Sequence, residues 1–311
     1  MNEIDVLKNG GITFEPPTLF SLRDFYRKTV KQGGQFFFIV SAVKNITRLL
    51  SHIVLVFYFE DEKHNGGRYA KYFKEDLIKT LLEKFYSEHI KLISSIFREV
   101  DLKKATEDFE QIFSELKTSV SLLKEGDNID KRYPFILKYG ELASASIFAN
   151  FLRSMGLSCK LINAQDHLTT TSSYENAQIL KLDNSFINYL SEAETFVTHG
   201  FIGKNQNGED TTFGYDGSDL SAAYFLRGLI RAGIKARLTY CKNVGRFYLQ
   251  DPFINKEAES FLEMNLDQYR KLPSHPIRLD AVEYAFAEEV ESIEMMCFLD
   301  PFAPKAKIFR G

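Results

Sequence analysis

Residues 196–252 decide the fold, and they read FVTHGFIGKNQNGEDTTFGYDGSDLSAAYFLRGLIRAGIKARLTYCKNVGRFYLQDP. An apolar run ends at Gly200, and Asn207-Gly208 then predicts a turn. The loop FGYDGSD, residues 213–219, precedes apolar residues at helical spacing that stop near Gly233. A second short apolar segment follows. The stretch therefore predicts a strand, a Gly-rich loop, a helix and another strand.

The loop FGYDGSD is also the first candidate for a functional site. A Gly-rich loop that opens a helix presents free backbone N–H groups, and the helix dipole adds partial positive charge. Ser218 and Asp219 are residue types that cap helices well, so we expect them at this junction. The junction fits a phosphate group, or a Mg²⁺-phosphate complex near Asp219. Alternatively it is an ordinary capped helix, which a motif this short favours when taken alone.

Outside this stretch, strands and helices are expected to alternate along the chain. The elements expected in the first 131 residues are a strand at Gly11–Phe14 broken by Pro16-Pro17, a helix at Leu19–Lys31, a turn at Gly33-Gly34, a buried strand at Gln35–Val40, a helix from near Val43 that includes Ile53–Phe59, a loop at His64–Arg68, a long charged helical region from Tyr69 to about Lys124, and a loop at Gly126–Lys131. Those expected later are a helix opened by Gly140-Glu141, a strand at Cys159–Ile162 with a loop up to Tyr174, and a strand at Phe196–Thr198. This alternation predicts an α/β sandwich.

Composition excludes several classes of protein. The chain has 39 basic and 42 acidic residues and a net charge of −3, so it has no general attraction to nucleic acid or to an anionic membrane. Its three cysteines, Cys159, Cys241 and Cys297, lie far apart, which indicates reduced thiols and a cytoplasmic protein rather than a disulfide framework. No CxxC or HExxH spacing predicts a metal site.

Targeting and membrane segments are not expected either. Residues 1–11 contain three charged side chains and lack the apolar core of a signal peptide. The run Ile53–Phe59 is too short to span a membrane and is predicted to lie in a buried helix.

Two blocks of the central stretch resemble the C-terminal part of the aspartokinase catalytic domain, in the amino acid kinase family. HGFIGKNQNGEDTTFGYDGSDLSA corresponds to the family pattern qGFiG…G…tTLGRGGSDytA, and CKNVGRFYLQDP corresponds to WTDVdGvYtaDP. Residues 139–179 and 277–294 are similar to two further family segments. The resemblance implies a three-layer sandwich with a mostly parallel central sheet. It implies a single catalytic domain over 1–311, with a helical insertion at about 65–125. An ACT regulatory domain is not expected, nor is inhibition by lysine or threonine.

The same resemblance implies roles for individual residues. Asp219 would organise catalysis. Glu141 would hold the α-amino group of the substrate, and Ser41 and Thr47 match hydroxyls on the substrate side. The nucleotide side would include Gly217, Ser218, Lys242, Asn243 and Tyr248. Each of Ser41, Thr47 and Glu141 also has an ordinary explanation, because Ser and Thr often cap helices and a Glu at a helix start is satisfied by the dipole.

The chain departs from the family pattern at several positions. The family begins KFGGTS, with a lysine that steadies the transferring phosphoryl group. Either residues 13–17 stand there, which loses the lysine, or Lys8 to Gly11 do, which keeps it. Tyr215 replaces an arginine that binds the substrate carboxylate in the family, and tyrosine lacks its bidentate fork. Residues 241–243 replace WTD, and Asp300 replaces a histidine.

Two functions remain open. The first is an ATP- and Mg²⁺-dependent kinase that phosphorylates a side-chain carboxylate, with aspartate giving 4-phosphoaspartate. The second is a catalytically impaired relative that acts as a binding or regulatory protein. A sugar-nucleotide or dehydrogenase protein is a distant third, because no early GxGxxG follows a first strand. The expected partners are ATP and an amino acid, and a homodimer remains open.

Overall fold

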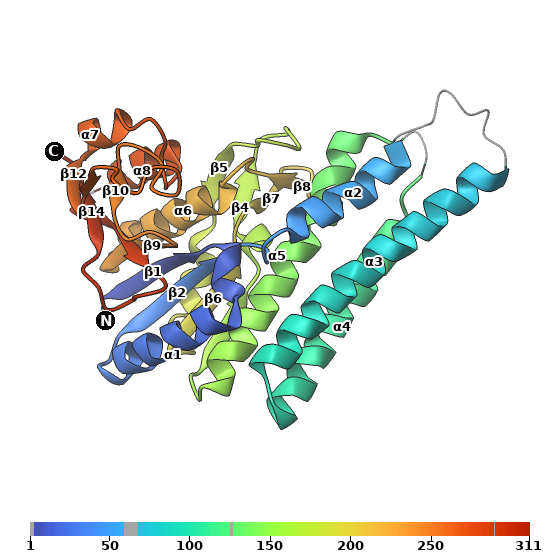
Figure 1. The fold of residues 1–311 in the computed structure, drawn as a ribbon, viewed down its shortest axis with the longest axis horizontal. Coiled ribbons are helices and arrows are strands. Elements are labelled where there is room, and N and C mark those ends of the chain that lie inside the picture. Colours follow the sequence, from blue (N-terminus) through green and yellow to red (C-terminus); the bar gives the residue numbers. More distant parts are fainter. Residues whose placement is uncertain (1–2, 59–67, 125–126, 289) are drawn as a thin grey trace.

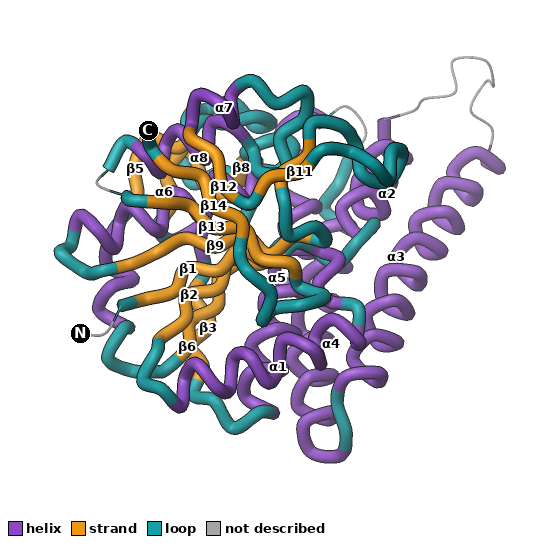
Figure 2. The backbone as a smooth tube through the Cα atoms, turned by 60° about the vertical axis from the view of Figure 1, so that its left-hand side comes forward, coloured by secondary structure: helices purple, strands orange, loops and turns teal. Residues whose placement is uncertain are grey.

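The computed structural model describes residues 3–58, 68–124, 127–288 and 290–311. Within these ranges the centre of the molecule is an eight-stranded sheet, which Figures 1 and 2 show from two directions. Its strands, from one edge to the other, are β12 (Glu263–Asn265), β14 (Ala306–Phe309), β13 (Ser292–Cys297), β9 (Ala236–Lys242), β1 (Ile4–Asn9), β2 (Gln35–Val40), β6 (Thr195–His199) and β3 (Cys159–Ile162). The pairs are parallel except β13 with β14. The mostly parallel sheet is confirmed.

Alternation along β2 shows why the sheet is covered on both faces. Phe36, Phe38 and Val40 lie in one buried cluster, whereas Phe37 and Ile39 lie in the other. An unbroken apolar strand buries both of its faces, because successive side chains point in opposite directions. Two cores therefore sandwich the sheet, and the predicted three-layer architecture is confirmed.

One face is covered by α1 (Pro16–Lys31) and α5 (Ile129–Ser154), and the other by α6 (Gly217–Arg231), which packs on β1 and β9. Beside α6 lies α8 (Leu279–Phe286). The helix α2 (Ile46–Tyr58) packs on α5, and α3 (Arg68–Ile96) with α4 (Glu99–Ser121) forms a hairpin outside them (Figure 1). The long helical region is thus two helices, and the predicted loop at 64–68 lies almost wholly outside the described residues. That this hairpin is an insertion stays a prediction.

A small second sheet stands beside the main one. It contains β5 (Ile179–Leu182), β4 (Leu168–Thr170), β7 (Ile202–Asn205) and β8 (Asp210–Thr212), in that order. β7 and β8 form an antiparallel hairpin, and Gly208 has a φ of +77° in the turn, which confirms the turn predicted at Asn207-Gly208. The segment before Tyr174, expected to be a loop, contains β4. Short elements complete the chain: η1 (Gly11–Phe14), η2 (Ala164–Asp166), η3 (Asn184–Tyr189), β10 (Phe247–Tyr248), β11 (Ser260–Phe261) and α7 (Leu266–Arg270).

The predicted loop at Gly126–Lys131 is wrong in its last three residues, which begin α5. Two further expectations about helix and strand positions were also wrong. The first strand is Ile4–Asn9 and not Gly11–Phe14, which forms a 3₁₀ turn. The charges of Asp5 and Lys8 hid this strand, yet each has an ionic partner in the fold, Arg237 and Asp219 respectively.

Gly140-Glu141 does not open a helix, because both residues lie in the middle of α5. A Cβ at Gly140 would come within 3.0 Å of the Ile46 side chain. The glycine therefore allows α2 to pack closely against α5, and it does not mark a helix end.

Candidate active site

Strand alternation directs two lysines at the same helix. On β1, Ile4 and Val6 face the α6 side of the sheet, and Lys8 is the next residue on that side. On β9, Leu238 and Tyr240 face the same side, and Lys242 follows them. The two strands are parallel neighbours, with Lys8 opposite Tyr240. Both ammonium groups therefore emerge near the carboxyl ends of adjacent strands, where loops gather and sites form in α/β sheets.

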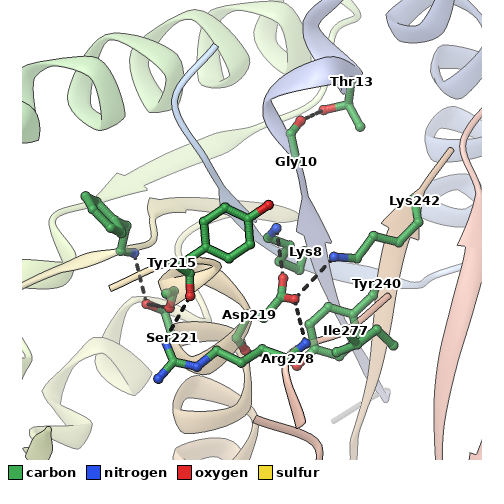
Figure 3. Close-up of polar contacts among 12 residues, drawn as sticks. Lys8, Gly10, Thr13, Tyr215, Asp219, Ser221, Tyr240, Lys242, Ile277 and Arg278 are labelled. Carbon is green, nitrogen blue, oxygen red and sulfur yellow. Dashed lines mark hydrogen bonds and ion pairs between the residues drawn. The ribbon is translucent and has the colours of Figure 1, made fainter. Parts of the chain in front are cut away.

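Asp219 lies in the first turn of α6 and receives both lysines (Figure 3). The Lys8 ammonium lies 2.8 Å from Asp219 Oδ1, and the Lys242 ammonium lies 3.2 Å from Oδ2. The carboxylate has no solvent-exposed surface, and the Lys8 side chain is 5% exposed. One buried anion thus orients two cations.

Arg278 and Tyr240 fix the position of Asp219. The Arg278 backbone N–H donates to Asp219 Oδ2 at 3.1 Å, and the Tyr240 hydroxyl donates to the Asp219 carbonyl oxygen at 3.0 Å. The Arg278 guanidinium donates to the carbonyl oxygens of Phe213 and Tyr215, so it also holds the loop that leads into α6. Two hydrogen-bond donors, the Lys242 ammonium and the Arg278 N–H, therefore reach Oδ2, whereas Oδ1 has the Lys8 ammonium as its ionic partner.

The charges of this cluster do not cancel. Burial would lower the pKa of Lys8, but the Asp219 carboxylate outweighs it and raises the pKa. Burial lowers the pKa of Lys242, which Asp219 offsets in part. For Asp219 burial acts to raise the pKa, and the two ammonium groups overcome it and lower the value. With both lysines protonated and Asp219 ionised, these three groups carry one surplus positive charge, which the nearby Asp216 carboxylate offsets in part. The cluster suits an anion such as a phosphoryl group.

The start of α6 differs in detail from the expectation. Asp216 occupies the N-cap position in the left-handed conformation, at φ 53°, and makes no side-chain cap. Ser218 and Asp219 lie at the predicted junction, but in the first turn of the helix and not at its N-cap. The N–H groups of Gly217 and Asp219 donate to the carbonyls of Gly214 and Asp216. The tight turn therefore uses two of the backbone N–H groups that were expected to be free for a phosphate.

Glu141 is a second buried carboxyl group. It is 3% exposed, and burial raises its pKa to about 8, although the Ala42 backbone amide and the Lys8 charge act in the opposite direction. Its Oε2 atom has no hydrogen-bond partner among the described residues. A buried oxygen without a hydrogen-bond partner is costly, so this atom is available to a ligand that donates a hydrogen bond.

The other predicted substrate-side residues have fewer contacts. Ser41 follows β2, and its N–H donates to the Asn9 carbonyl at 3.0 Å. Thr47 lies half-buried in the first turn of α2, inside the helix and not at its cap. The Tyr215 side chain is 90% exposed, and only its carbonyl oxygen takes part in the hydrogen bonds described above. No described contact joins these three side chains to Asp219.

The predicted nucleotide-side residues follow β9. Asn243 is exposed and its carbonyl oxygen accepts from the Cys297 thiol at 3.7 Å. Tyr248 lies in β10 and pairs with Ser260 of β11. Gly217 and Ser218 are buried at the start of α6, where a Cβ on Gly217 would lie 2.8 Å from Phe213. The fold thus brings Lys8, Lys242 and Asp219 into contact, while the roles of all predicted site residues stay predictions.

The position of Lys8 bears on the two alternatives for the family's lysine. Lys8 meets Asp219 directly, whereas Thr13 bonds back to the Gly10 carbonyl within the 3₁₀ turn. The geometry favours the alternative in which Lys8 to Gly11 occupy that position. Arg278 and Tyr240 were not predicted. Alternation along β9 could have indicated Tyr240, but a backbone N–H donor such as that of Arg278 leaves no sequence signal.

Among the described residues, no group of three or more His, Cys, Asp or Glu could hold a metal ion. The part of the chain with described structure also lacks any helix of sufficient length and apolarity to cross a membrane. All three cysteines are free thiols.

Comparison with known proteins identifies the family of the chain. The sequence pattern of the Amino acid kinase family matches residues 5–288. The chain is 32% identical over 141 residues to an aspartokinase of Helicobacter pylori, which covers 45% of this chain and 34% of the relative. It is 29% identical over 182 residues to an aspartokinase of Geobacillus stearothermophilus, which covers 55% of this chain and 43% of the relative. These matches span less than half of either relative.

The fold also resembles solved structures. The crystal structure of E. coli aspartokinase III in complex with aspartate and ADP superimposes with a TM-score of 0.75 at 18% identity, covering 99% of this chain and 65% of that one. Clostridium acetobutylicum aspartate kinase gives a TM-score of 0.71 at 17% identity, covering 99% of this chain and 63% of that one. At these identities the likeness shows the fold alone.

Proposed function

The chain belongs to the amino acid kinase family, and on that premise we propose that it transfers the γ-phosphoryl group of ATP to the side-chain carboxylate of an amino acid. We propose aspartate as the acceptor and 4-phosphoaspartate as the product, because the relatives are aspartokinases. The observation that carries the proposal is the buried Lys8–Asp219–Lys242 cluster with its surplus positive charge.

The reaction needs charge stabilisation more than covalent help from the protein. A carboxylate oxygen of the acceptor attacks the γ-phosphorus and forms a new O–P bond. The bond from phosphorus to the oxygen bridging the β- and γ-phosphates breaks, and ADP leaves with that electron pair. Lys8 and Lys242 stabilise the negative charge on the transferring group, and Asp219 holds both lysines in position. Pre-oriented charges of this kind need no reorganisation when the reaction occurs.

Magnesium belongs to this proposal as part of the substrate. Both oxygens of Asp219 already have cationic or N–H partners, and the described residues form no metal-binding cluster. The residues present therefore do not fit a metal held by the protein alone. We propose that Mg²⁺ enters bound to ATP, and no step of the mechanism is assigned to it.

We also propose that Glu141 and Tyr215 lie on the side of the site that binds the acceptor. The unpartnered Oε2 of Glu141 supports a role in holding the amino group of the acceptor, next to the Lys8 charge. Ser41 and Thr47 are proposed on the same side, and Gly217, Ser218, Asn243 and Tyr248 on the nucleotide side. The proposed setting is the cytoplasm, and pairing into a homodimer stays a prediction.

A second function is favoured by one observation. Tyr215 offers no guanidinium for the second carboxylate of aspartate, and its side chain is 90% exposed. A relative that binds ATP without transferring phosphate, and acts as a binding or regulatory protein, would have such a site. Both candidates would bind the nucleotide, but only the kinase would transfer its phosphoryl group.

Hydroxylamine trapping separates the two functions, because it converts an acyl phosphate into a stable hydroxamate. The protein would be incubated with Mg-ATP and aspartate, then with related amino acids, while thermal unfolding with and without Mg-ATP reports nucleotide binding. Hydroxamate with aspartate supports the aspartate kinase, and hydroxamate with another acid alone supports a changed acceptor. Stabilisation by Mg-ATP without any hydroxamate would support the non-catalytic relative. The absence of both hydroxamate and stabilisation by Mg-ATP would overturn both functions.

A further inference from the structure

A charged groove lies away from the Asp219 cluster, between the amino end of α5 and the β7–β8 hairpin. Figure 1 shows these elements beside one another, and ion pairs join them. The groove encloses about 570 Å³, a volume in the range of small-molecule sites. None of its lining residues belongs to the Lys8–Asp219–Lys242 cluster. Its lining includes four basic and three acidic side chains, which makes it unlike an ordinary apolar pocket.

The acidic side chains of the groove already have partners. Glu209 accepts from the Lys131 ammonium at 2.6 Å, the Asn205 amide at 2.9 Å and the Tyr174 hydroxyl at 3.0 Å. These hydrogen bonds lower the pKa of Glu209 to about 2, so it is ionised at neutral pH. Its two oxygens are therefore occupied and are not open to a cationic ligand.

The other two carboxylates are occupied as well. Asp210 accepts from the Lys138 ammonium at 2.8 Å through one oxygen and from the Gln165 amide at 2.6 Å through the other. Asp127 forms an ion pair with Arg132. Each acidic group in the groove thus neutralises one basic group.

Lys204 is the basic residue that remains. It lies on β7, is half-buried, and lines the groove. Its side chain forms no hydrogen bond or ion pair with any other residue that the structure describes. Its cross-strand neighbour Asp210 is already engaged by Lys138 and Gln165. The charged side chains that line the groove therefore sum to one surplus positive charge, with Lys204 as the unpaired member. A half-buried ammonium without a partner gains by meeting an anion.

We propose that this groove binds a small anion with a carboxylate or phosphate group, whose oxygens accept hydrogen bonds from the Lys204 ammonium. The size of the groove admits a small metabolite. The occupied carboxylates exclude a cation as the ligand. This site is independent of the proposed kinase reaction and holds whether or not that reaction occurs.

Amine labelling with residue resolution tests the site. The full chain would be acylated with a limiting amine-reactive ester, and the modification of each lysine would be measured by mass spectrometry. Inorganic phosphate and succinate would be titrated separately, at constant ionic strength. Lys181, an exposed lysine on β5 of the same small sheet, is the matched control. The labelling of Lys8 and Lys242 is measured in the same experiment, so anion binding at the candidate active site is distinguished from binding in the groove.

The expected result is saturable protection of Lys204 by one or both anions, reaching about tenfold at ten times the Kd by mass action. Protection by phosphate alone identifies a phosphate ligand, and protection by succinate alone a carboxylate. The proposed site would be overturned if neither anion changed the labelling of Lys204. It would also be overturned if the labelling of Lys181 and Lys204 fell equally, and in proportion to the anion concentration.

Calorimetric titration of Lys204→Gln and Lys181→Gln gives a second readout that does not depend on labelling. The glutamine removes the charge of Lys204 and keeps most of its length. Loss of anion binding with Lys204→Gln and retention with Lys181→Gln is expected. Equal binding by both variants would contradict the proposal.

Discussion

The Lys8 ammonium lies 2.8 Å from Asp219 Oδ1, although Lys8 lies near the end of the first strand and Asp219 lies in the first turn of a helix in the second half of the chain. This ion pair is fully buried, so removing one partner leaves the other uncompensated. Lys8→Met removes one of the two cations proposed to stabilise the phosphoryl group. We expect kcat to fall by about 10²–10³-fold, as when a pre-oriented donor is removed. Hydroxamate formation measures this.

Lys235→Met is the matched control for Lys8→Met, because Lys235 is exposed and lies just before β9, outside the cluster. Its turnover should equal that of the unmodified protein. If Lys8→Met retains full turnover, Lys8 does not act on the transferring group.

Asp219→Ala tests the residue that organises both lysines. Without the carboxylate, the Lys8 and Lys242 ammonium groups repel each other and lose their common position. We expect phosphoryl transfer to be lost while circular dichroism shows an intact fold. Asp219→Asn keeps the shape and removes the charge, so it should also be inactive. Unchanged turnover in either correctly folded variant rules out the proposed role of Asp219.

Tyr215→Arg tests whether the arginine of the family pattern would strengthen binding of the acceptor. The side chain is 90% exposed, so an arginine fits without disturbing the core. A guanidinium that meets the second carboxylate of aspartate contributes about 1.5–3 kcal/mol, and we expect KM for aspartate to fall by at least about tenfold. Tyr215→Lys adds the charge without the bidentate fork and should improve KM less. Equal effects of both variants would mean that charge alone matters.

The raised pKa of Glu141 predicts a dependence of stability on pH. Burial raises its pKa to about 8 in the folded state, whereas the unfolded value is 4.5. Between these values the folded state binds more protons than the unfolded state, so the contribution of Glu141 to stability is complete below about pH 4.5 and is lost as pH rises towards 8. Glu141→Gln cannot ionise and should lack this loss.

Urea unfolding of both proteins at pH 5, 6.5 and 8 measures the effect. Relative to the unmodified protein, Glu141→Gln should gain unfolding free energy as pH increases. A constant difference across the three values would show that Glu141 does not carry a raised pKa.

Two adjacent glycines give a prediction about the loop after β1. A Cβ at Gly11 would lie 2.2 Å from the Ala42 carbonyl oxygen, whereas a Cβ at Gly10 would have the Lys8 ammonium at 4.0 Å as its nearest neighbour. Gly11→Ala must therefore displace the backbone, and overpacking of this kind costs about 1–3 kcal/mol. Gly10→Ala should change the free energy of unfolding by much less. Equal destabilisation by both would mean that the close approach is not rigid.

Much of the fold could be predicted because local patterns determine it. The apolar strand Gln35–Val40 appears where periodicity places it, and so does the helix, which begins at Gly217 inside FGYDGSD. The strand Ile4–Asn9 was missed because its buried Asp5 and Lys8 imitate a surface segment. Their partners, Arg237 and Asp219, are far away in sequence, so no local pattern indicates that these charges are compensated.

The sequence by itself determined the strand–loop–helix unit and an α/β sandwich, because period-two and period-3.6 patterns are local properties. The mostly parallel sheet and the candidate residues came from the resemblance of its motifs to the aspartokinase pattern. Only the tertiary structure decided that Lys8, and not residues 13–17, meets Asp219, and that Lys242 and the backbone of Arg278 share the same carboxylate. It also decided that Lys204 alone lacks a partner in its groove, within the described residues. The physical reason is that charge pairing depends on distance through space, and the crossovers of a parallel sheet bring together side chains that are remote along the chain.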